Sequence, residues 1–128
     1  MRPVNLSALV ALVLADLSAG TSTRPTVSYS PLDEGMVEVL LTDDDGMGVG
    51  FGVQPDRSEA DVLCALADRI PDAFVELYAV GLPLVPGTRR PARADVVDGV
   101  ALWTDPAGGP WSCPVGRYGE TVRPHGGP

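Results

Sequence analysis

Glycine alternates with apolar residues over residues 46–53, and this pattern limits the possible folds more than any other feature of the chain. The apolar members are Met47, Val49, Phe51 and Val53. A period of two is that of a β-strand, so one face carries four apolar side chains and the other carries none. Glycine weakens a strand, so we expect something to approach the bare face closely at Gly48 and Gly50. A helix of the same domain is the first candidate, and a partner, ligand or second subunit is the alternative.

Two further strands are predicted just before this segment. Residues 26–30 alternate around Val27 and Tyr29, and residues 36–42 place Val37, Val39 and Leu41 on one face. The second and third strands are separated by an Asp-Gly pair that favours a tight hairpin. Residues 27–53 are therefore predicted to form a three-stranded antiparallel meander.

Helical periodicity flanks the meander on both sides. Residues 3–19 carry one continuous apolar stripe, with Asn5 able to cap the start and Gly20 expected to end the helix. A second helix is predicted from Ser58, either kinked or restarted at Pro71, and ended by Gly81. The apolar stripe of the first helix consists of Leu6, Leu9, Val10, Val13, Leu14 and Leu17.

The last third of the chain is rich in proline and glycine, and its clearest signal is a hairpin over residues 94–104 with an Asp98-Gly99 turn. The sequence thus predicts one α+β domain over residues 1–128, with a core over 21–120 and a flexible tail over 121–128. We expect residues 27–53 and 94–104 to share one sheet beneath the two helices. The alternative is a mostly β, barrel-like sheet crossed by one helix.

Residues 1–20 have a second interpretation, which is a secretory signal segment. Met1-Arg2 gives a basic start and residues 6–15 are an apolar run of suitable length. Asp16 and Leu17 stand where small neutral residues normally precede cleavage, which favours a cytoplasmic protein over a secreted one. The run is too short to span a membrane, so no membrane association is expected.

The inventory of reactive side chains excludes many enzyme classes. The 128 residues contain no lysine, and the single histidine, His125, lies in the Pro- and Gly-rich terminus. Schiff-base, pyridoxal-phosphate and P-loop chemistry are therefore excluded. Cys64 and Cys113 with His125 fall short of a zinc site at any familiar spacing, so neither a metal nor a cofactor is expected.

The net charge of −8 is concentrated at the front of the chain, where residues 1–61 hold ten acids and three arginines. Such a surface repels phosphate backbones, so direct nucleic-acid binding is not expected. It could instead imitate a nucleic acid and inhibit a DNA- or RNA-binding protein. That alternative requires one contiguous acidic surface made of Asp33, Glu34, Glu38, Asp43, Asp44 and Asp45.

Residues 67–114 resemble small bacterial proteins of the high-GC Gram-positive group. The matching features are the Asp98-Gly99 hairpin and the ending Trp111-Ser112-Cys113-Pro114. Those proteins carry a Cys-Pro-Gly-His-Pro-His-Pro-like segment, and residues 85–91 here read Val-Pro-Gly-Thr-Arg-Arg-Pro. The resemblance implies a fold and no activity, because the cysteine and histidine positions are replaced and Cys113 alone could carry over.

Three groups of residues are candidate sites, each with a structural alternative. The arginines of residues 89–93 could grip a carboxylate or phosphate, or simply pair with the acidic half. Trp103 and Trp111 could mark a binding surface or fill the core. Asp72 and Glu76, one turn apart, could act as an acid–base pair or lie on a solvated helix face. The arginines of the first group are Arg89, Arg90 and Arg93.

Taken together, these features favour a non-enzymatic protein-interaction module, such as an accessory, immunity-type or assembly subunit. Its partner would be another protein or a second copy. An enzyme built on carboxylates and arginine is a third hypothesis, after the nucleic-acid mimic. It requires Asp72, Glu76 or Asp95 to face the arginines across a cleft, with a perturbed carboxylate pKa.

Overall fold

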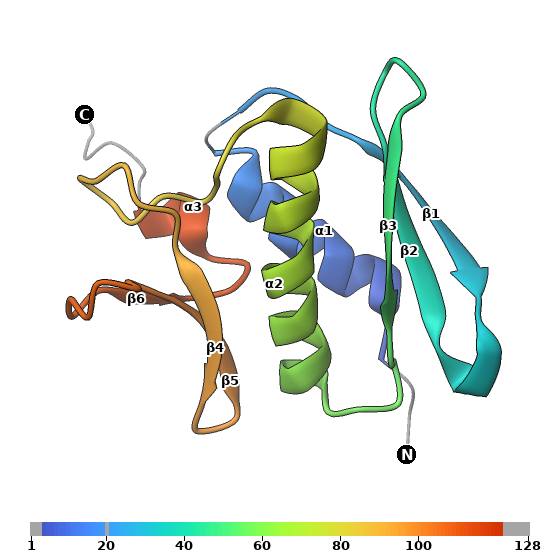
Figure 1. Ribbon diagram of the computed structural model, residues 1–128. Coiled ribbons are helices and arrows are strands. Elements are labelled where there is room, and N and C mark those ends of the chain that lie inside the picture. Colours follow the sequence, from blue (N-terminus) through green and yellow to red (C-terminus); the bar gives the residue numbers. More distant parts are fainter. Residues whose placement is uncertain (1–3, 20, 122–128) are drawn as a thin grey trace.

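The computed structural model describes residues 4–19 and 21–121, in which two helices lie between two three-stranded antiparallel sheets (Figure 1). This architecture confirms the predicted α+β class. The alternative of a mostly β sheet with one helix is wrong, because two long helices fill the space between the sheets. The elements in order are α1 (Leu6–Leu17), β1 (Thr26–Pro31), η1 (Asp33–Gly35), β2 (Val37–Thr42), β3 (Gly48–Val53), α2 (Glu59–Tyr78), β4 (Arg93–Val97), β5 (Val100–Thr104), β6 (Ser112–Pro114) and α3 (Tyr118–Thr121).

Helix α1 forms where its apolar stripe predicts it. The Asn5 side chain accepts a hydrogen bond from the Ala8 N–H at 3.1 Å, as expected of an N-cap. The stripe faces the core, with Leu9, Val10, Val13 and Leu17 buried. The predicted end at Gly20 lies outside the described residues. Helix α1 is thus an integral part of the core.

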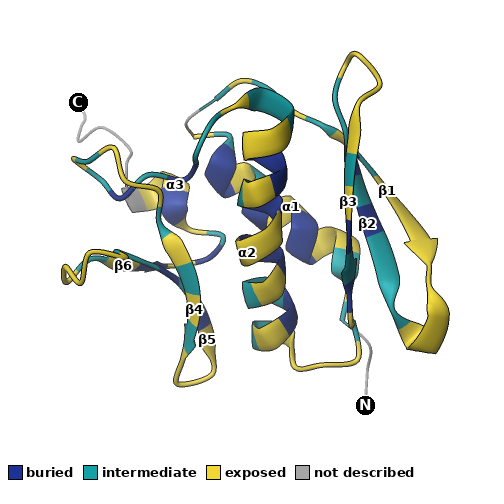
Figure 2. Cartoon of the chain, viewed as in Figure 1, coloured by how far each residue is buried: buried dark blue, intermediate teal, exposed yellow. Residues whose placement is uncertain are grey.

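The first sheet has the strand order β1-β2-β3, as the meander prediction requires. One face of this sheet packs inward, where Val39, Leu41, Phe51 and Val53 are buried (Figure 2). The same alternation places Gly48, Gly50 and Gly52 on the opposite, outer face. The apolar side chains of segment 46–53 therefore attach β3 to the core, and the glycines face away from the helices.

Helix α2 runs without interruption through Pro71, so the prediction of a restarted helix is wrong. Ser58 caps the helix by accepting the Asp61 N–H at 3.1 Å. The helix ends at Tyr78, and its C-cap Ala79 adopts the left-handed conformation (φ 58°), so the end comes before the expected Gly81. Six residues of α2 are buried, namely Val62, Leu66, Ala67, Ile70, Ala73 and Phe74.

The second sheet has the order β4-β5-β6 and shares no strand pairing with the first. The predicted hairpin forms with its turn at Asp98-Gly99, but the prediction of a single sheet is wrong. Helix α2 packs against β3 on one side and against β4 and β5 on the other, so it separates the sheets (Figure 1). Strand β6 and helix α3 had no counterpart in the sequence prediction. Within the described ranges, no helix is long and apolar enough to cross a membrane.

Candidate interaction surfaces

The hydrogen bonds at the hairpin ends show which way the backbone of each strand residue points. Asp43 donates its N–H to the Met47 carbonyl at 2.9 Å, so odd-numbered residues of β3 bond to β2. The even-numbered residues of β3 therefore point their N–H and C=O groups away from the sheet. These residues are Gly48, Gly50 and Gly52, and they form the free edge of β3. No other hydrogen bond occupies their backbone groups within residues 4–19 and 21–121.

Two cavities lie along this free edge, between β3 and α2. The larger, of about 350 Å³, is lined by Gly52 and Val53 of β3 and by Asp61, Val62 and Ala65 of α2. The smaller, of about 160 Å³, is lined by Val49, Gly50 and Phe51 and by Arg69, Asp72, Ala73 and Glu76. The edge of β3 and the facing side of α2 thus border a groove, which we call the β3–α2 groove.

The outer face of the glycines is covered by side chains of the same sheet and not by a helix. A Cβ atom on Gly50 would lie 2.9 Å from the Glu38 carboxylate, and one on Gly48 would lie 3.2 Å from Leu40 Cδ1. The prediction that a helix approaches this face is wrong, because α2 packs on the opposite face through Phe51 and Val53. The alternative of a partner on this side stays a prediction.

Charge is unevenly distributed along the β3–α2 groove. At one end Arg57 donates from Nε to Gln54 Oε1 at 3.0 Å, and Asp61 lies beside it. At the other end Asp72 and Glu76 line the smaller cavity, while the Arg69 guanidinium lies 5.8 Å from the centre of the Phe51 ring.

The β2–β3 hairpin adds to the acidic end of the groove. Burial raises the pKa of Tyr78, and the negative charges of Asp43 and Asp44 raise it further. The negative charges of Asp43 and Asp44 therefore add to the negative potential at the C-terminal end of α2, where Glu76 also lies.

The edges of β4 and β1 are less accessible or less complete than the edge of β3. On β4, the even-numbered residues face outward, and Val96 donates its N–H to Asp95 Oδ1 at 2.9 Å. Ala92, just before β4, donates its N–H to the Pro83 carbonyl at 2.6 Å. On β1, Val27 and Tyr29 face outward, but Pro31 has no N–H to offer. Compared with these two edges, the glycine edge of β3 offers three free donors beside a helix.

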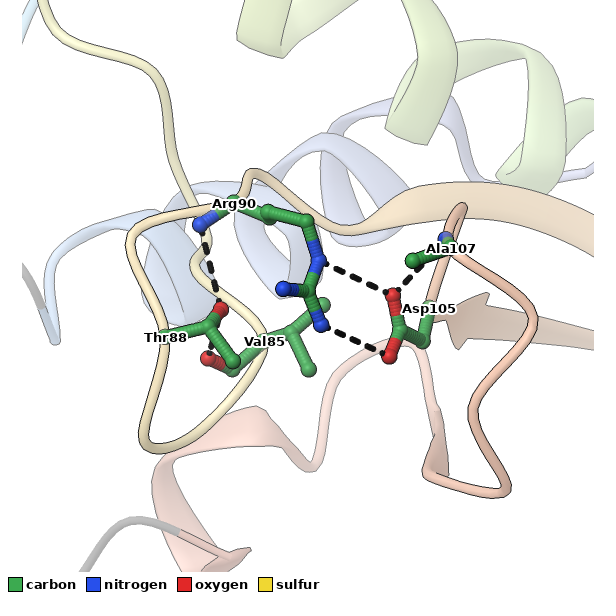
Figure 3. A network of polar contacts seen from close by, with 5 residues as sticks. All are labelled: Val85, Thr88, Arg90, Asp105 and Ala107. Carbon is green, nitrogen blue, oxygen red and sulfur yellow. Dashed lines mark hydrogen bonds and ion pairs between the residues drawn. The ribbon is translucent and has the colours of Figure 1, made fainter.

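The arginine cluster is partly occupied by an internal carboxylate. Arg90 donates from Nη2 to Asp105 Oδ2 at 3.0 Å and from Nε to Asp105 Oδ1 at 3.3 Å (Figure 3). Asp105 Oδ1 also accepts the Ala107 N–H at 2.9 Å. The hydrogen bonds from Arg90 lower the pKa of Asp105. Arg90 therefore grips a carboxylate through two hydrogen bonds, and this carboxylate belongs to the same chain.

The other two arginines are exposed, and one of them borders a third cavity. Arg93 lines a cavity of about 230 Å³ between α2 and β4, together with Asp68 and Asp72. Glu76 does not line this cavity, and Asp95 is engaged with the neighbouring Val96 N–H. The structure thus brings Asp72 and Arg93 to one cleft, with both side chains exposed.

Trp103 is fully buried (0% exposed), so its predicted place on a binding surface is wrong and the core alternative is confirmed. Its indole Nε1–H donates to Asp16 Oδ2 at 2.7 Å. Asp16 is itself buried (1% exposed) and also accepts the Gly116 N–H at 2.6 Å and the Tyr118 N–H at 3.0 Å. This structural role of Asp16 has no local sequence signal, because its three donors lie far along the chain.

The remaining candidate residues show no reactive arrangement. Trp111 is half-buried and packs edge to face against Tyr118, with ring centres 6.2 Å apart. Cys64 is half-buried on α2, and burial raises the pKa of its thiol, with smaller contributions from Asp95, Asp68 and Asp61. In the part of the chain that the structure describes, no group of three or more His, Cys, Asp or Glu side chains could hold a metal ion.

No family model, no curated protein and no solved structure matches this chain. The resemblance of residues 67–114 to small bacterial proteins therefore stays a prediction.

Proposed function

We propose that this protein is a non-enzymatic interaction module that binds another protein through the free edge of β3. The observation that carries the proposal is the row of three outward-facing glycine backbones beside α2. An unpaired strand edge is a template for pairing with another chain, and proteins usually block such edges with charges, proline or a covering element. Here the glycines offer no side chain that could block it.

The distribution of ionisable groups supports a binding role over catalysis. Asp72, Glu76 and Asp95 are exposed, which argues against the desolvated acid–base pair that the enzyme hypothesis requires. The raised pKa of Cys64 keeps its thiol protonated and poorly nucleophilic.

The nucleic-acid mimic is the weaker alternative, because its acids form two groups on the first sheet. Asp33 and Glu34 precede β2, and residues 43–45 follow it. A six-residue strand separates these groups by roughly 20 Å. Glu38 lies between these two groups along β2, on the outer face of the first sheet.

We further propose that the protein acts in the cytoplasm. Helix α1 contributes Leu9, Val10 and Val13 to the core, so removal of residues 1–20 as a signal segment would take buried side chains away.

A substitution at Gly50 tests the proposed function. Gly50→Pro removes one outward-facing N–H and leaves the pairing of β3 with β2 intact, because Gly50 does not bond to β2. Gly50→Ala keeps this N–H and is the matched control. Each variant would be immobilised and exposed to an extract of the native host, and retained proteins would be quantified. We expect a partner held by the original chain and by Gly50→Ala, and lost with Gly50→Pro. A partner retained equally by all three would place the interface elsewhere and reject the proposed use of β3.

A further inference from the structure

We propose that the β3–α2 groove receives an extended peptide segment that carries a lysine or arginine side chain. The inference rests on the proposed function and names the chemistry of the partner. The segment would pair with the glycine edge as an added strand, and its basic side chain would enter the cavity lined by Asp72 and Glu76.

The geometry of an added strand determines which of its side chains meet α2. Side chains of residues directly opposite each other lie on the same face of a sheet. Partner residues opposite the glycines would therefore lie on the outer face, beside Glu38 and Leu40. Residues opposite Val49 and Phe51 would point inward to the smaller cavity. One alternate side chain of the segment is thus directed at the acidic wall of α2.

Charge complementarity selects the basic side chain. Asp72 and Glu76 line the smaller cavity with one arginine, Arg69, which lies over the Phe51 ring. The acidic hairpin residues Asp43 and Asp44 lie toward the same end of α2. A cation from the partner is therefore favoured there and an anion is repelled. A second copy of this chain, whose own net charge is −8, is a less complementary occupant.

Short peptides provide the direct test. The probe is a blocked, fluorescein-labelled heptapeptide, Thr-Val-Thr-Lys-Thr-Val-Thr, and its matched control has glutamate in place of lysine. Binding to the full chain would be measured by fluorescence polarisation, and the contacted residues by amide chemical shifts. We expect the Lys peptide to shift the Gly48, Gly50 and Gly52 signals and to bind roughly fivefold more tightly than the Glu peptide.

Variants of the chain separate the two parts of the inference. Gly50→Pro is expected to weaken the Lys peptide roughly tenfold, while Gly50→Ala changes its affinity less than about twofold. Combined Asp72→Asn and Glu76→Gln substitutions should abolish the preference for lysine and leave backbone pairing in place. If Gly50→Pro fails to fold, the unaltered chain can be tested with a Lys peptide whose amides along one strand edge are N-methylated. Loss of binding would then show that backbone hydrogen bonds to the β3 edge are required.

Any one of the following results would overturn the inference. The first is equal binding of the Lys and Glu peptides. The second is a set of shifts at Val27 and Tyr29, which would identify the β1 edge, or no shifts at millimolar peptide. The third is a homodimer by light scattering that Gly50→Pro dissociates, because a second copy would then be the occupant. Capture of a host protein that depends on Gly50 would still support the proposed function if the peptides failed. Conversely, peptide binding without such capture would support the inference alone.

Discussion

At the scale of single residues, the Asp16 carboxylate connects distant parts of the chain, and no local sequence pattern indicates this role. Its two oxygens accept three N–H groups, from Trp103 of β5, from Gly116, and from Tyr118 at the start of α3. None of these donors is a charged side chain. Burial raises the pKa of Asp16 above its ordinary value of 3.8, while the three hydrogen bonds act in the opposite direction. The carboxylate thus connects α1 to the C-terminal sheet at an electrostatic cost.

The raised pKa of Asp16 predicts an unusual pH dependence of the stability of the folded chain. Because the pKa of Asp16 is higher in the folded state, the folded chain binds the Asp16 proton more tightly than the unfolded chain does. The contribution of Asp16 titration is therefore greatest below about pH 3.8 and is lost as pH rises through the folded-state pKa. Asp16→Asn removes this titration. The stability of the original chain relative to Asp16→Asn, measured by urea unfolding, should fall from pH 3 toward pH 7.

Asp105 provides the matched control for this measurement. Its pKa is lowered by Arg90, so its contribution is present above about pH 3.8 and is lost as pH falls. Asp105→Asn should therefore give the opposite trend to Asp16→Asn. The same trend for both variants would contradict the assignment of Asp16 as a carboxylate whose folded-state pKa is raised.

At the scale of elements, β3 combines two different surfaces in six residues. Its apolar residues Phe51 and Val53 are buried against the helices. Its glycines leave the outward edge bare, and the outer face of Gly48 and Gly50 is covered by side chains of the same sheet. At Gly48 and Gly50, the atoms nearest to an added Cβ are the ends of the flexible Leu40 and Glu38 side chains. The strand is therefore held by one face, and the other can accept new side chains.

Replacement of two glycines by valine tests this description. Gly48→Val with Gly50→Val should raise stability by about 1 kcal/mol, because glycine is a poor strand former and the contacting side chains can rotate away. Thermal melting would show an increase of a few degrees. A lower melting temperature would mean that Glu38 and Leu40 are fixed in place and that the outer face is already closely packed.

The elements differ in how well the sequence predicts them, and the reason is the range of the interactions that form them. Helix α1, the β1–β3 meander, α2 and the β4–β5 hairpin depend on local periodicity, caps and turns, and all were predicted. Strand β6 spans three residues and ends in Pro114, so it has no period of its own and exists through pairing with β5. Pro71 lies inside α2 because packing on both sides of the helix overrides the local preference.

In the candidate site, too, some features follow from local sequence patterns and others depend on contacts between distant residues. Gly48 and Gly50 were singled out by their alternation, but the sequence predicted a covering helix on a face that β2 side chains occupy. The direction of the glycine backbone follows from the register of β2 and β3, which residue patterns alone do not specify. The partners of Arg90 and Asp16 are separated from them by 15 and by 87 to 102 residues, beyond any local pattern.

At the scale of the whole molecule, the central helices make the two sheets interdependent. Helix α2 contacts β3 in the first sheet and β4 and β5 in the second, and α1 contacts both α2 and α3. Neither sheet packs on a core of its own, because the buried side chains form one cluster that spans both. We therefore expect the chain to unfold in a single cooperative step.

Tryptophan fluorescence and circular dichroism can test this expectation together. Trp111→Phe leaves Trp103 as the single tryptophan and keeps an aromatic ring beside Tyr118. In urea, Trp103 fluorescence, which reports the second sheet, and far-ultraviolet circular dichroism, which reports all helices and strands, should have the same midpoint. A lower midpoint for fluorescence would mean that the second sheet melts first and that the molecule has two stability units.

The hydrogen bonds of Asp16 also have a consequence for synthesis on the ribosome. The segment that forms α1 emerges first, yet its donors Trp103, Gly116 and Tyr118 follow 87 to 102 residues later. Until they emerge, the nascent chain carries the Asp16 carboxylate without its three hydrogen-bond donors. Such distant contacts slow folding, and incompletely folded chains are bound by chaperones. The hydrogen bonds of Asp16 can therefore be completed only after Tyr118 has been synthesised.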